Sequence, residues 1–267
     1  MSAHRVMAIA LRQAYLLRGS PVRILPLFGW VAVDIVLWGF ITKYLNTVAG
    51  RGIDFVAALL GAVLLWDFMA RVMQGFTTAF FEDVWARNFL NIFATPLTLP
   101  EYVCGLVCSS VTTSSVGLVA MVLMATLFFG LSFFSYGMLL VPFLLVLFLT
   151  GITLGILGSS LVLRLGPAAE WFIWPIPAML APFSGVYYPL STLPAWMQYI
   201  GRLLPASYVF EGMRAVIAGR GAPWGMLGWG VGLGMMYLIL ISWFFTRTYH
   251  RAVRTGLIAR YSAETIS

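Results

Sequence analysis

The chain has 267 residues, of which 61% are hydrophobic and only 9% are charged, and its mean hydropathy is +0.94. Soluble domains carry about 25% charged residues, so this composition excludes a protein whose whole surface faces water and predicts an all-α integral membrane protein. The net charge of +7 gathers near the two ends of the chain, which is typical of orientation in a bilayer and gives no reason to expect a nucleic-acid partner.

The segment 1–23 predicts an amphipathic helix in the cytoplasmic interface of the membrane. Its arginines alternate with apolar residues at roughly helical spacing over residues 3–19, and such a helix lies on the lipid surface. No short apolar core with a small-residue cleavage site precedes them, so a secretory signal is not expected. A disordered basic leader is the alternative that the pattern leaves open. The arginines are Arg5, Arg12, Arg18 and Arg23.

Six transmembrane helices are expected from the apolar runs, since each span needs about 20 residues. The fifth span begins near Ala168 and is interrupted by Pro175, Pro177 and Pro182, because proline cannot continue the hydrogen-bond ladder of a helix. The other five spans cover about residues 24–45, 53–80, 103–130, 136–163 and 224–245.

The positive residues predict that both termini lie in the cytoplasm. With six spans, the side that carries the termini collects ten arginines and the opposite side collects five positive residues, and cytoplasmic loops carry the excess of positive charge. The ten are Arg5, Arg12, Arg18, Arg23, Arg87, Arg164, Arg247, Arg251, Arg254 and Arg260. The five are Lys43, Arg51, Arg202, Arg214 and Arg220.

Three charged residues fall inside the predicted spans, where charge is costly and indicates function by default. Asp67 and Arg71 are four residues apart and share one helix face, so an internal ion pair, snorkelling of the arginine and a role in lining a conduit all remain open. Asp34 has no partner nearby in the sequence and is expected to face the protein interior.

The residues needed for catalysis are missing from the predicted spans. The histidines are His4 and His250, near the two ends of the chain, and neither an H-E-x-x-H nor a G-x-S-x-G motif occurs. No G-x-x-x-x-G-K-[ST] loop is present either, so this chain is not expected to bind ATP itself. Cys104 and Cys108 share one helix face and are expected to be small packing residues. The sequence therefore predicts neither an enzyme nor a metal site or cofactor in this chain.

Small residues recur at spacings that let helix backbones approach closely in lipid. They predict either packing within the chain or a contact between subunits, and the sequence does not decide between the two. The pairs are Gly151 and Gly155, Gly228 and Gly232, and Gly230 and Gly234.

Residues 82–101, EDVWARNFLNIFATPLTLPE, predict a short amphipathic helix on the cytoplasmic side. After Glu82 and Asp83, apolar residues recur every three to four positions over 84–94, with polar residues on the other side, and Pro96 ends the pattern. Such a helix can lie on lipid or dock into a groove of a partner protein. The apolar positions are Trp85, Phe89, Ile92 and Phe93, and the polar ones are Arg87, Asn88 and Asn91.

This helix is followed by ATPLTLPEYVCG and then a new span, an order that resembles the coupling-helix region of ABC-2 type exporter permeases. A second stretch, FSGVYYPLSTLPAWMQYIGRLLPASYVFEGMRAVI over residues 183–217, is similar to the outer segment of the same family. The two motifs stand in the family's order, on predicted opposite sides of the membrane. The resemblance covers nearly the whole chain and implies a single ABC-2 type transmembrane domain over residues 1–267.

Membership of that family would imply six spans in each copy, an assembly of two copies (expected here to be a homodimer) and two ABC nucleotide-binding subunits that bind ATP and Mg²⁺. It implies a bacterial inner-membrane location among lipids and an outer re-entrant segment over residues 183–222. The positions implied for coupling to the ATPase are Glu82, Asp83, Trp85, Arg87, Asn88, Phe89 and Phe93. The positions implied for an outer gate are Gly185, Tyr187, Tyr188, Pro189, Leu193, Pro194 and Trp196.

The function implied is ATP-driven export of an amphipathic or lipid-linked substrate, such as a lipid, drug or glycoconjugate, from the cytoplasm or the inner leaflet. Two alternatives come from the residues themselves. An ion-coupled secondary transporter would use Asp34 or Asp67, and a structural membrane anchor would transport nothing. The nature of the cargo is not encoded in any motif of the chain.

Overall fold

The computed structural model describes residues 1–19, 21–48, 56–86, 88, 91–92, 94–131 and 137–255, and these residues contain helices and turns but no strand. Short 3₁₀ turns, Pro167–Ala169 and Leu190–Thr192, join some of the helices. The helices are α1 (Ala3–Arg18), α2 (Pro21–Val48), α3 (Gly61–Trp85, preceded by a π-helical turn Val56–Leu60), α5 (Leu99–Phe129), α6 (Leu140–Leu165), α7 (Glu170–Ile173), α8 (Ile176–Ser184), α9 (Ala195–Arg202), α10 (Pro205–Ile217) and α11 (Trp224–Arg254).

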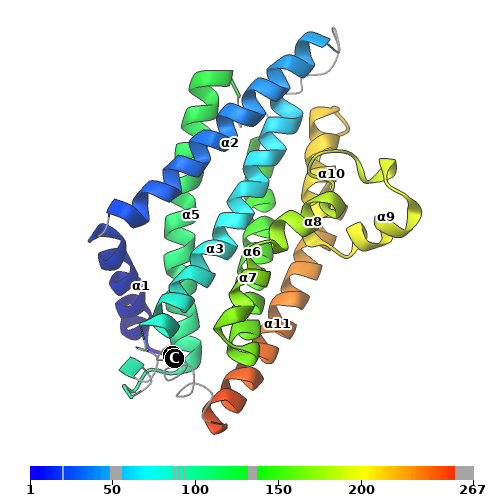
Figure 1. Ribbon diagram of the computed structural model, residues 1–267. Coiled ribbons are helices and arrows are strands. Elements are labelled where there is room, and N and C mark those ends of the chain that lie inside the picture. Colours follow the sequence, from blue (N-terminus) through cyan, green and yellow to red (C-terminus); the bar gives the residue numbers. More distant parts are fainter. Residues whose placement is uncertain are drawn as a thin grey trace.

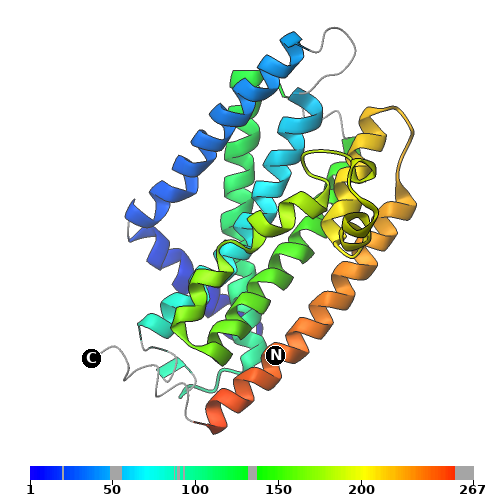
Figure 2. The same ribbon diagram turned by 45° about the vertical axis from the view of Figure 1, so that its right-hand side comes forward.

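Four segments are long and apolar enough to cross a membrane: Ala58–Val84, Leu99–Phe129, Gly137–Leu165 and Trp224–Arg254. They include α3, α5, α6 and α11, which run along one another through the molecule (Figures 1 and 2). The helix α2 has 28 residues, or about 42 Å at 1.5 Å per residue. The expected all-helical membrane fold is confirmed, and the count of six spans stays a prediction.

The fifth predicted span is built from short pieces, as its prolines suggested. The helix α7 has four residues and α8 has nine, with Pro175 between them and Pro182 inside α8. The two short helices run along the bundle toward α9 and α10 (Figure 2). The outer segment therefore follows a broken helix, and it lies toward the opposite end of the bundle from the start of α1 (Figure 1).

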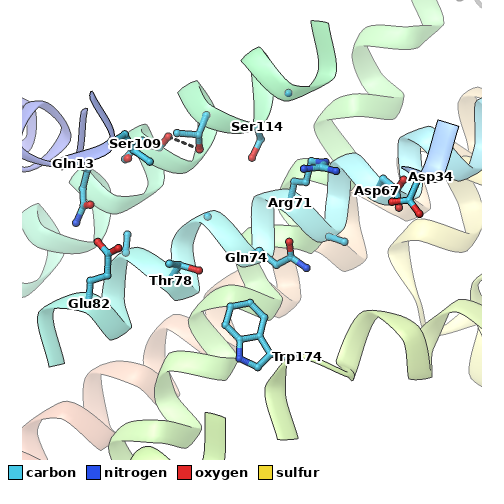
Figure 3. Close-up of a pocket in the computed structure, with 16 residues that line it drawn as sticks. Gln13, Asp34, Asp67, Arg71, Gln74, Thr78, Glu82, Ser109, Ser114 and Trp174 are labelled. Carbon is cyan, nitrogen blue, oxygen red and sulfur yellow. Dashed lines mark hydrogen bonds between the residues drawn. The ribbon is translucent and has the colours of Figure 1, made fainter. Parts of the chain in front are cut away.

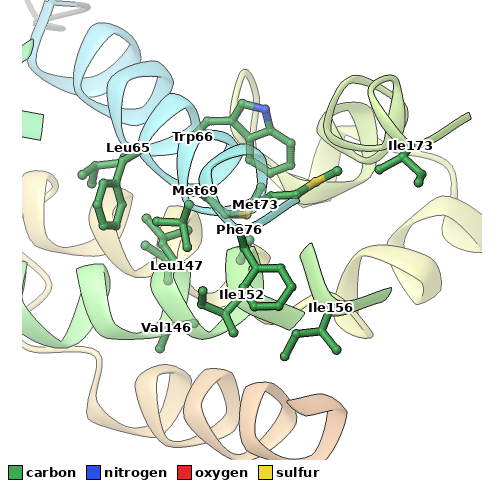
Figure 4. Close-up of a cluster of buried hydrophobic side chains, with 14 of the residues drawn as sticks. Leu65, Trp66, Met69, Met73, Phe76, Val146, Leu147, Ile152, Ile156 and Ile173 are labelled. Carbon is green, nitrogen blue, oxygen red and sulfur yellow. The ribbon is translucent and has the colours of Figure 1, made fainter. Parts of the chain in front are cut away.

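The core is centred on α3, which packs against α6 and α5. Met69, Val72, Met73, Phe76 and Phe80 of α3 are fully buried, and several of them meet apolar side chains of α6 (Figure 4). Their spacing of three or four residues defines one face of the helix. This face anchors α3 and leaves its other side to line the site.

Small residues allow this packing because they let the helix backbones approach closely. Such close contact matters in a membrane, since lipid provides no hydrophobic driving force for helices to associate. A methyl group added at Gly151 would lie 2.6 Å from the carbonyl oxygen of Met69, so only glycine permits that approach. Ser110 of α5 adds a hydrogen bond across helices, donating from Oγ to the carbonyl of Val72 at 2.7 Å. The small residues of α6 therefore serve packing within the chain.

The two overlapping glycine pairs of α11 differ in their surroundings. Gly230 and Gly234 pack against α6, with Val146 and Leu149 within 3.5 Å of an added methyl group. No described atom lies within 4 Å of a methyl group added at Gly228 or Gly232. Gly230 and Gly234 thus serve packing within the chain, whereas Gly228 and Gly232 meet no neighbour among the described residues.

Candidate functional site

A cavity of about 570 Å³, lined by both polar and apolar groups, lies between α1, α2, α3 and α5 (Figure 3). Its longest wall is one face of α3, opposite the buried face described above. Trp174, next to the break of the fifth predicted span, completes the lining. The polar lining residues are Gln13, Asp34, Asp67, Arg71, Gln74, Thr78, Glu82, Ser109, Thr113 and Ser114.

The three charged residues predicted inside the spans gather at one end of this cavity (Figure 3). The carboxyl groups of Asp34 and Asp67 lie at hydrogen-bonding distance, and Arg71 is near enough for its charge to act on both. Asp34, which was expected to face the interior, is partly buried and lines the cavity, and its neighbour is Asp67 on another helix. The sequence suggested the Asp67 and Arg71 pair by spacing but contained no signal that joins Asp34 to it.

The outer segment reaches the neighbourhood of this cluster through Tyr187. Its ring stacks on that of Trp38 of α2, with ring centroids 5.2 Å apart and planes 15° from parallel. Both Asp67 and Asp34 are close enough to act electrostatically on the tyrosine hydroxyl. Stacked aromatic pairs contribute about 0.5–1.5 kcal/mol beyond their buried area, so this contact fastens the outer segment to α2.

The backbone around Gly185 is held by two charged residues of α10 that the sequence had not placed in the site. Arg214 donates from Nη2 to the Gly185 carbonyl at 2.6 Å and pairs with Glu211 at 2.8 Å. Glu211 in turn accepts a hydrogen bond from the backbone N–H of Leu190 at 2.8 Å. Gly185 itself has φ 72°, a left-handed conformation that side chains disfavour.

The remaining residues predicted for the outer gate form the turns that follow. Tyr188 donates from its hydroxyl to the Pro182 carbonyl at 2.9 Å. Trp196 is 61% exposed and contacts the ring of Phe183 edge-on. Pro189, Leu193 and Pro194 supply carbonyl groups that accept hydrogen bonds in the turns entering and leaving Leu190–Thr192 and starting α9. The seven predicted residues thus lie in one continuous segment.

At the other end of α3, the residues predicted for coupling lie partly in the helix itself and partly in the segment that follows it. Glu82 and Asp83 belong to the last turns of α3, which ends at Trp85, so the predicted amphipathic helix does not begin at residue 84. The carbonyl of Asn88 accepts a hydrogen bond from the N–H of Ile92 at 2.9 Å, and residues 91 and 92 are helical. The side chain of Trp85 and the predicted residues Arg87, Phe89 and Phe93 lie outside the described part of the chain.

Asp83 was expected to face a partner, but its side chain is fully buried. It accepts hydrogen bonds from Arg12 of α1 and from the Tyr102 hydroxyl of α5, the latter at 2.8 Å. The hydrogen bond to Asp83 raises the pKa of the Arg12 guanidinium above its ordinary value, against an opposing effect of burial. The carboxylate turns inward because its partners come from α1 and α5, distant in sequence.

Glu101 makes a matching set of bonds on the other side of the segment 86–98. It accepts from the backbone N–H of Ser2 at 2.7 Å and of Thr98 at 2.9 Å, and pairs with Arg5 at 3.4 Å. Arg5 also donates to the Pro96 carbonyl at 2.6 Å. The helix α1 is therefore bonded to both flanks of this segment, a set of contacts here called the α1 clamp.

The sequence fits one known family of membrane proteins. The family model described as "ABC-2 type transporter" matches residues 9–218, which include Arg12 and Asp83 of the α1 clamp, the cavity and most of the outer segment. No protein with curated annotation matches the chain. Because the matched region is well over half of the chain, this multi-pass membrane protein belongs to the ABC-2 type transporter family and is a transport permease.

Proposed function

We propose that the chain is the transmembrane subunit of an ATP-driven exporter, working as a pair of identical copies with two ABC ATPase subunits. ATP and Mg²⁺ would be bound in those subunits, since the ABC-2 membrane family generally partners with an ABC ATPase. The observation that carries the proposal is the α1 clamp, because it fixes both flanks of the segment predicted to dock onto the ATPase. The proposal also includes six spans and two cytoplasmic termini in a bacterial inner membrane.

The proposed docking surface consists of the segment that follows α3. Glu82, Trp85, Arg87, Asn88, Phe89 and Phe93 are assigned to contact with the ATPase, and Asp83 is assigned to positioning the segment, since it is buried. A helix transmits displacement along its length because its backbone hydrogen bonds are internal. Closure of the ATPase pair would then move α3, and with it Asp67 and Arg71.

The outer gate is proposed to lie in residues 183–222, with Gly185 to Trp196 at its centre. The stack of Tyr187 on Trp38 supports this assignment, because it joins the segment to α2 close to the charged end of the cavity. Opening would separate the two rings. ATP would bind more tightly to the conformation in which the gate is open, and this difference in affinity would shift the population of transporters toward that conformation.

The decisive experiment is purification of the tagged chain in mild detergent, followed by an ATPase assay of the soluble subunit that accompanies it. Vanadate-sensitive hydrolysis by a stoichiometric partner is the expected result. A homogeneous chain without any ATPase, reproduced in lipid nanodiscs, would overturn the proposal. A chain carrying Arg18→Ala, an exposed position on α1, serves as the matched control for tagging and extraction.

A change within the proposed docking surface gives a first prediction. Phe89→Asp should abolish transport while leaving membrane insertion and basal ATP hydrolysis intact, because it places a charge where an apolar side chain is proposed to enter a partner groove. The measurement is transport in proteoliposomes beside hydrolysis in the same preparation. Wild-type transport by this variant would contradict the coupling assignment.

An ion-coupled secondary transporter is the second candidate, and the proximity of Asp34 to Asp67 on two helices is the observation that favours it. Paired intramembrane carboxyl groups are typical of proton and cation relays. This candidate predicts transport driven by an ion gradient without ATP, lost in both Asp34→Asn and Asp67→Asn. Transport that needs ATP and no gradient would exclude it.

A further inference from the structure

The carboxyl groups of Asp34 and Asp67 meet where α2, α3 and the outer segment come together. Asp34 lies on α2 and Asp67 on α3, and their carboxyl groups are at hydrogen-bonding distance. Both side chains lie at the same end of the cavity (Figure 3). Tyr187 of the outer segment stacks on Trp38 of α2, and both carboxyl groups act electrostatically on its hydroxyl. The contact therefore joins α2 to α3 close to the place where the outer segment meets α2.

A hydrogen bond between two carboxyl groups needs a proton. An ionised carboxylate only accepts hydrogen bonds, whereas a protonated carboxyl group also donates one. Asp67 Oδ2 is buried, and no donor of the described residues bonds to it. Two carboxylates at such a distance repel each other, so a pair of this kind keeps one proton between its members. The contact of Asp34 with Asp67 is therefore explained by one carboxylate, one carboxylic acid and the proton that they share.

The charge next to the pair agrees with a single proton. Arg71 lies four residues after Asp67 on α3, and its charge acts on both carboxyl groups. With one shared proton, the two carboxyl groups and the guanidinium sum to zero charge. Without that proton, one negative charge would be left uncompensated inside a membrane span, where charge is costly. The surroundings therefore favour the pair that holds one proton.

The other groups that face the cavity leave this balance unchanged. The outer segment brings Tyr187 near the pair. Glu82, another acidic residue of the lining, lies 15 residues from Asp67 along α3, or about 22 Å at 1.5 Å per residue. The described residues of α5 that line the cavity carry no charge, and they are Ser109, Thr113, Ser114 and Gly117.

We propose that Asp34 and Asp67 form a proton-binding site that joins α2 to α3, and that displacement of α3 during the transport cycle releases its proton. Release breaks the O–H bond of the carboxylic acid, leaves the electron pair on that oxygen and transfers the proton to a water molecule. The two carboxylates then repel each other, which keeps the helices apart. The release step rests on the proposed exporter function, in which the ATPase moves α3. Binding of the proton needs only this chain, so the two can fail separately.

Infrared spectroscopy of the full chain in lipid nanodiscs detects the proton directly. A protonated carboxyl group has a C=O stretching band that an ionised carboxylate lacks, and exchange of H₂O for D₂O shifts this band. The native chain should show the band at neutral pH. Asp34→Asn and Asp67→Asn should each abolish it, because the amide of asparagine then donates to the remaining carboxylate. Absence of the band from the native chain, or its persistence in either variant, would overturn the proposal.

Glu211→Gln is the matched control, since it makes the same change from carboxyl to amide in a residue that pairs with Arg214. This variant should keep the band of the native chain. Loss of the band in Glu211→Gln would show that the signal does not come from the proposed pair. If Asp67→Asn does not fold, Asp34→Asn on the other helix decides the matter.

An inorganic cation between two carboxylates is the other arrangement that could hold them together. The spectra are therefore recorded in sodium chloride and in choline chloride at the same ionic strength. A shared proton should give the same band in both salts. Loss of the band in sodium chloride would overturn the proposal in favour of a cation site.

Release of the proton is measured on the complex with the co-purified ATPase. A non-hydrolysable ATP analogue is added in weakly buffered medium, so that hydrolysis produces no acid, and a pH indicator reports the change. The native complex should release about one proton more per permease chain than the complex with Asp34→Asn. Equal release by the two complexes would reject the link between the proton and the transport cycle.

The two measurements separate this inference from the function on which its second half rests. The infrared band in a chain that co-purifies with no ATPase would keep the proton-binding site and reject the exporter. An ATPase partner together with a chain that lacks the band would do the reverse. Release caused by the ATP analogue without an ion gradient would also exclude the ion-coupled transporter as the explanation of the pair.

Discussion

Two buried or paired acidic residues, Asp83 and Glu101, define how the chain holds the segment between α3 and α5. Each accepts hydrogen bonds from α1 and from the region where α5 begins. Hydrogen bonds to charged groups contribute about 1.5–3 kcal/mol each. These residues therefore act within the chain, as fixing points for a segment that is proposed to be pushed by a partner.

Loss of Arg12 should weaken the attachment of α1 to Asp83. Arg12→Ala leaves the carboxylate of Asp83 buried with Tyr102 alone, and we expect a loss of about 1–3 kcal/mol in the stability of α1 docking. Amide hydrogen exchange over Ala3–Arg18 measures it. Adding Asp83→Asn should recover much of the loss, because it removes the unpaired charge. An equal effect of Arg18→Ala, at an exposed position, would contradict the assignment.

Arg214 should control the geometry of the outer segment. Arg214→Met removes the hydrogen bond to the Gly185 carbonyl and leaves Glu211 without its cation, so we expect amide exchange over residues 185–190 to accelerate and transport to fall. The exposed Arg220 provides the control variant, Arg220→Met, which should behave as the native chain. Slow exchange in both variants would show that the turn does not depend on Arg214.

Single residues show where sequence reasoning succeeds and where it stops. Spacing along one helix predicted that Asp67 and Arg71 lie close together, because neighbours at i and i+4 are set by helix geometry alone. The contacts of Asp83 with Arg12 and of Glu101 with Ser2 join residues that are 71 and 99 positions apart. Nothing local in a single sequence encodes such pairs, so Asp83 was expected to face outward.

At the scale of helices, the packing of α3 on α6 depends on the absence of side chains at Gly151 and Gly155. Gly151→Leu should cost about 1–3 kcal/mol, since overpacking forces the two helices apart. Thermal unfolding in nanodiscs measures the loss. Gly232→Leu is the matched control, because an added side chain there meets open space in the single chain. Equal loss in both variants would contradict the packing role of Gly151.

The helices themselves were largely predictable, since long apolar runs and prolines are strong local signals. The break of the fifth predicted span follows from Pro175 and Pro182, which lie at and within α8. The boundary between α3 and the amphipathic segment was placed wrongly at residue 84, because the pattern of apolar residues continues through Trp85 without interruption. The polar face of α3 that lines the cavity was also missed. Gln74 and Thr78 form one helix face with Glu82 only once Glu82 is known to belong to the same helix.

At the scale of the whole molecule, the distribution of arginine predicts that both termini face the cytoplasm. A fluorescent protein fused after residue 267 should fluoresce, and alkaline phosphatase fused there should be inactive. The same phosphatase inserted after Ser191, in the turn between α8 and α9, should be active, since this turn belongs to the outer segment. The reverse pattern of activities would invert the membrane orientation and remove the basis for the coupling assignment.

The α1 clamp has a consequence for engineering hybrid permeases. Exchange of residues 83–101 between relatives, intended to switch the ATPase that is recognised, would place the incoming residues at positions 83 and 101 against Arg12, Ser2 and Arg5 of the recipient. The transplant should therefore work only when Ser2 to Arg12 travels with the segment. If the segment docks onto an ATPase as proposed, the unit to be transplanted is discontinuous, with its partners Arg12 and Asp83 71 positions apart in the chain.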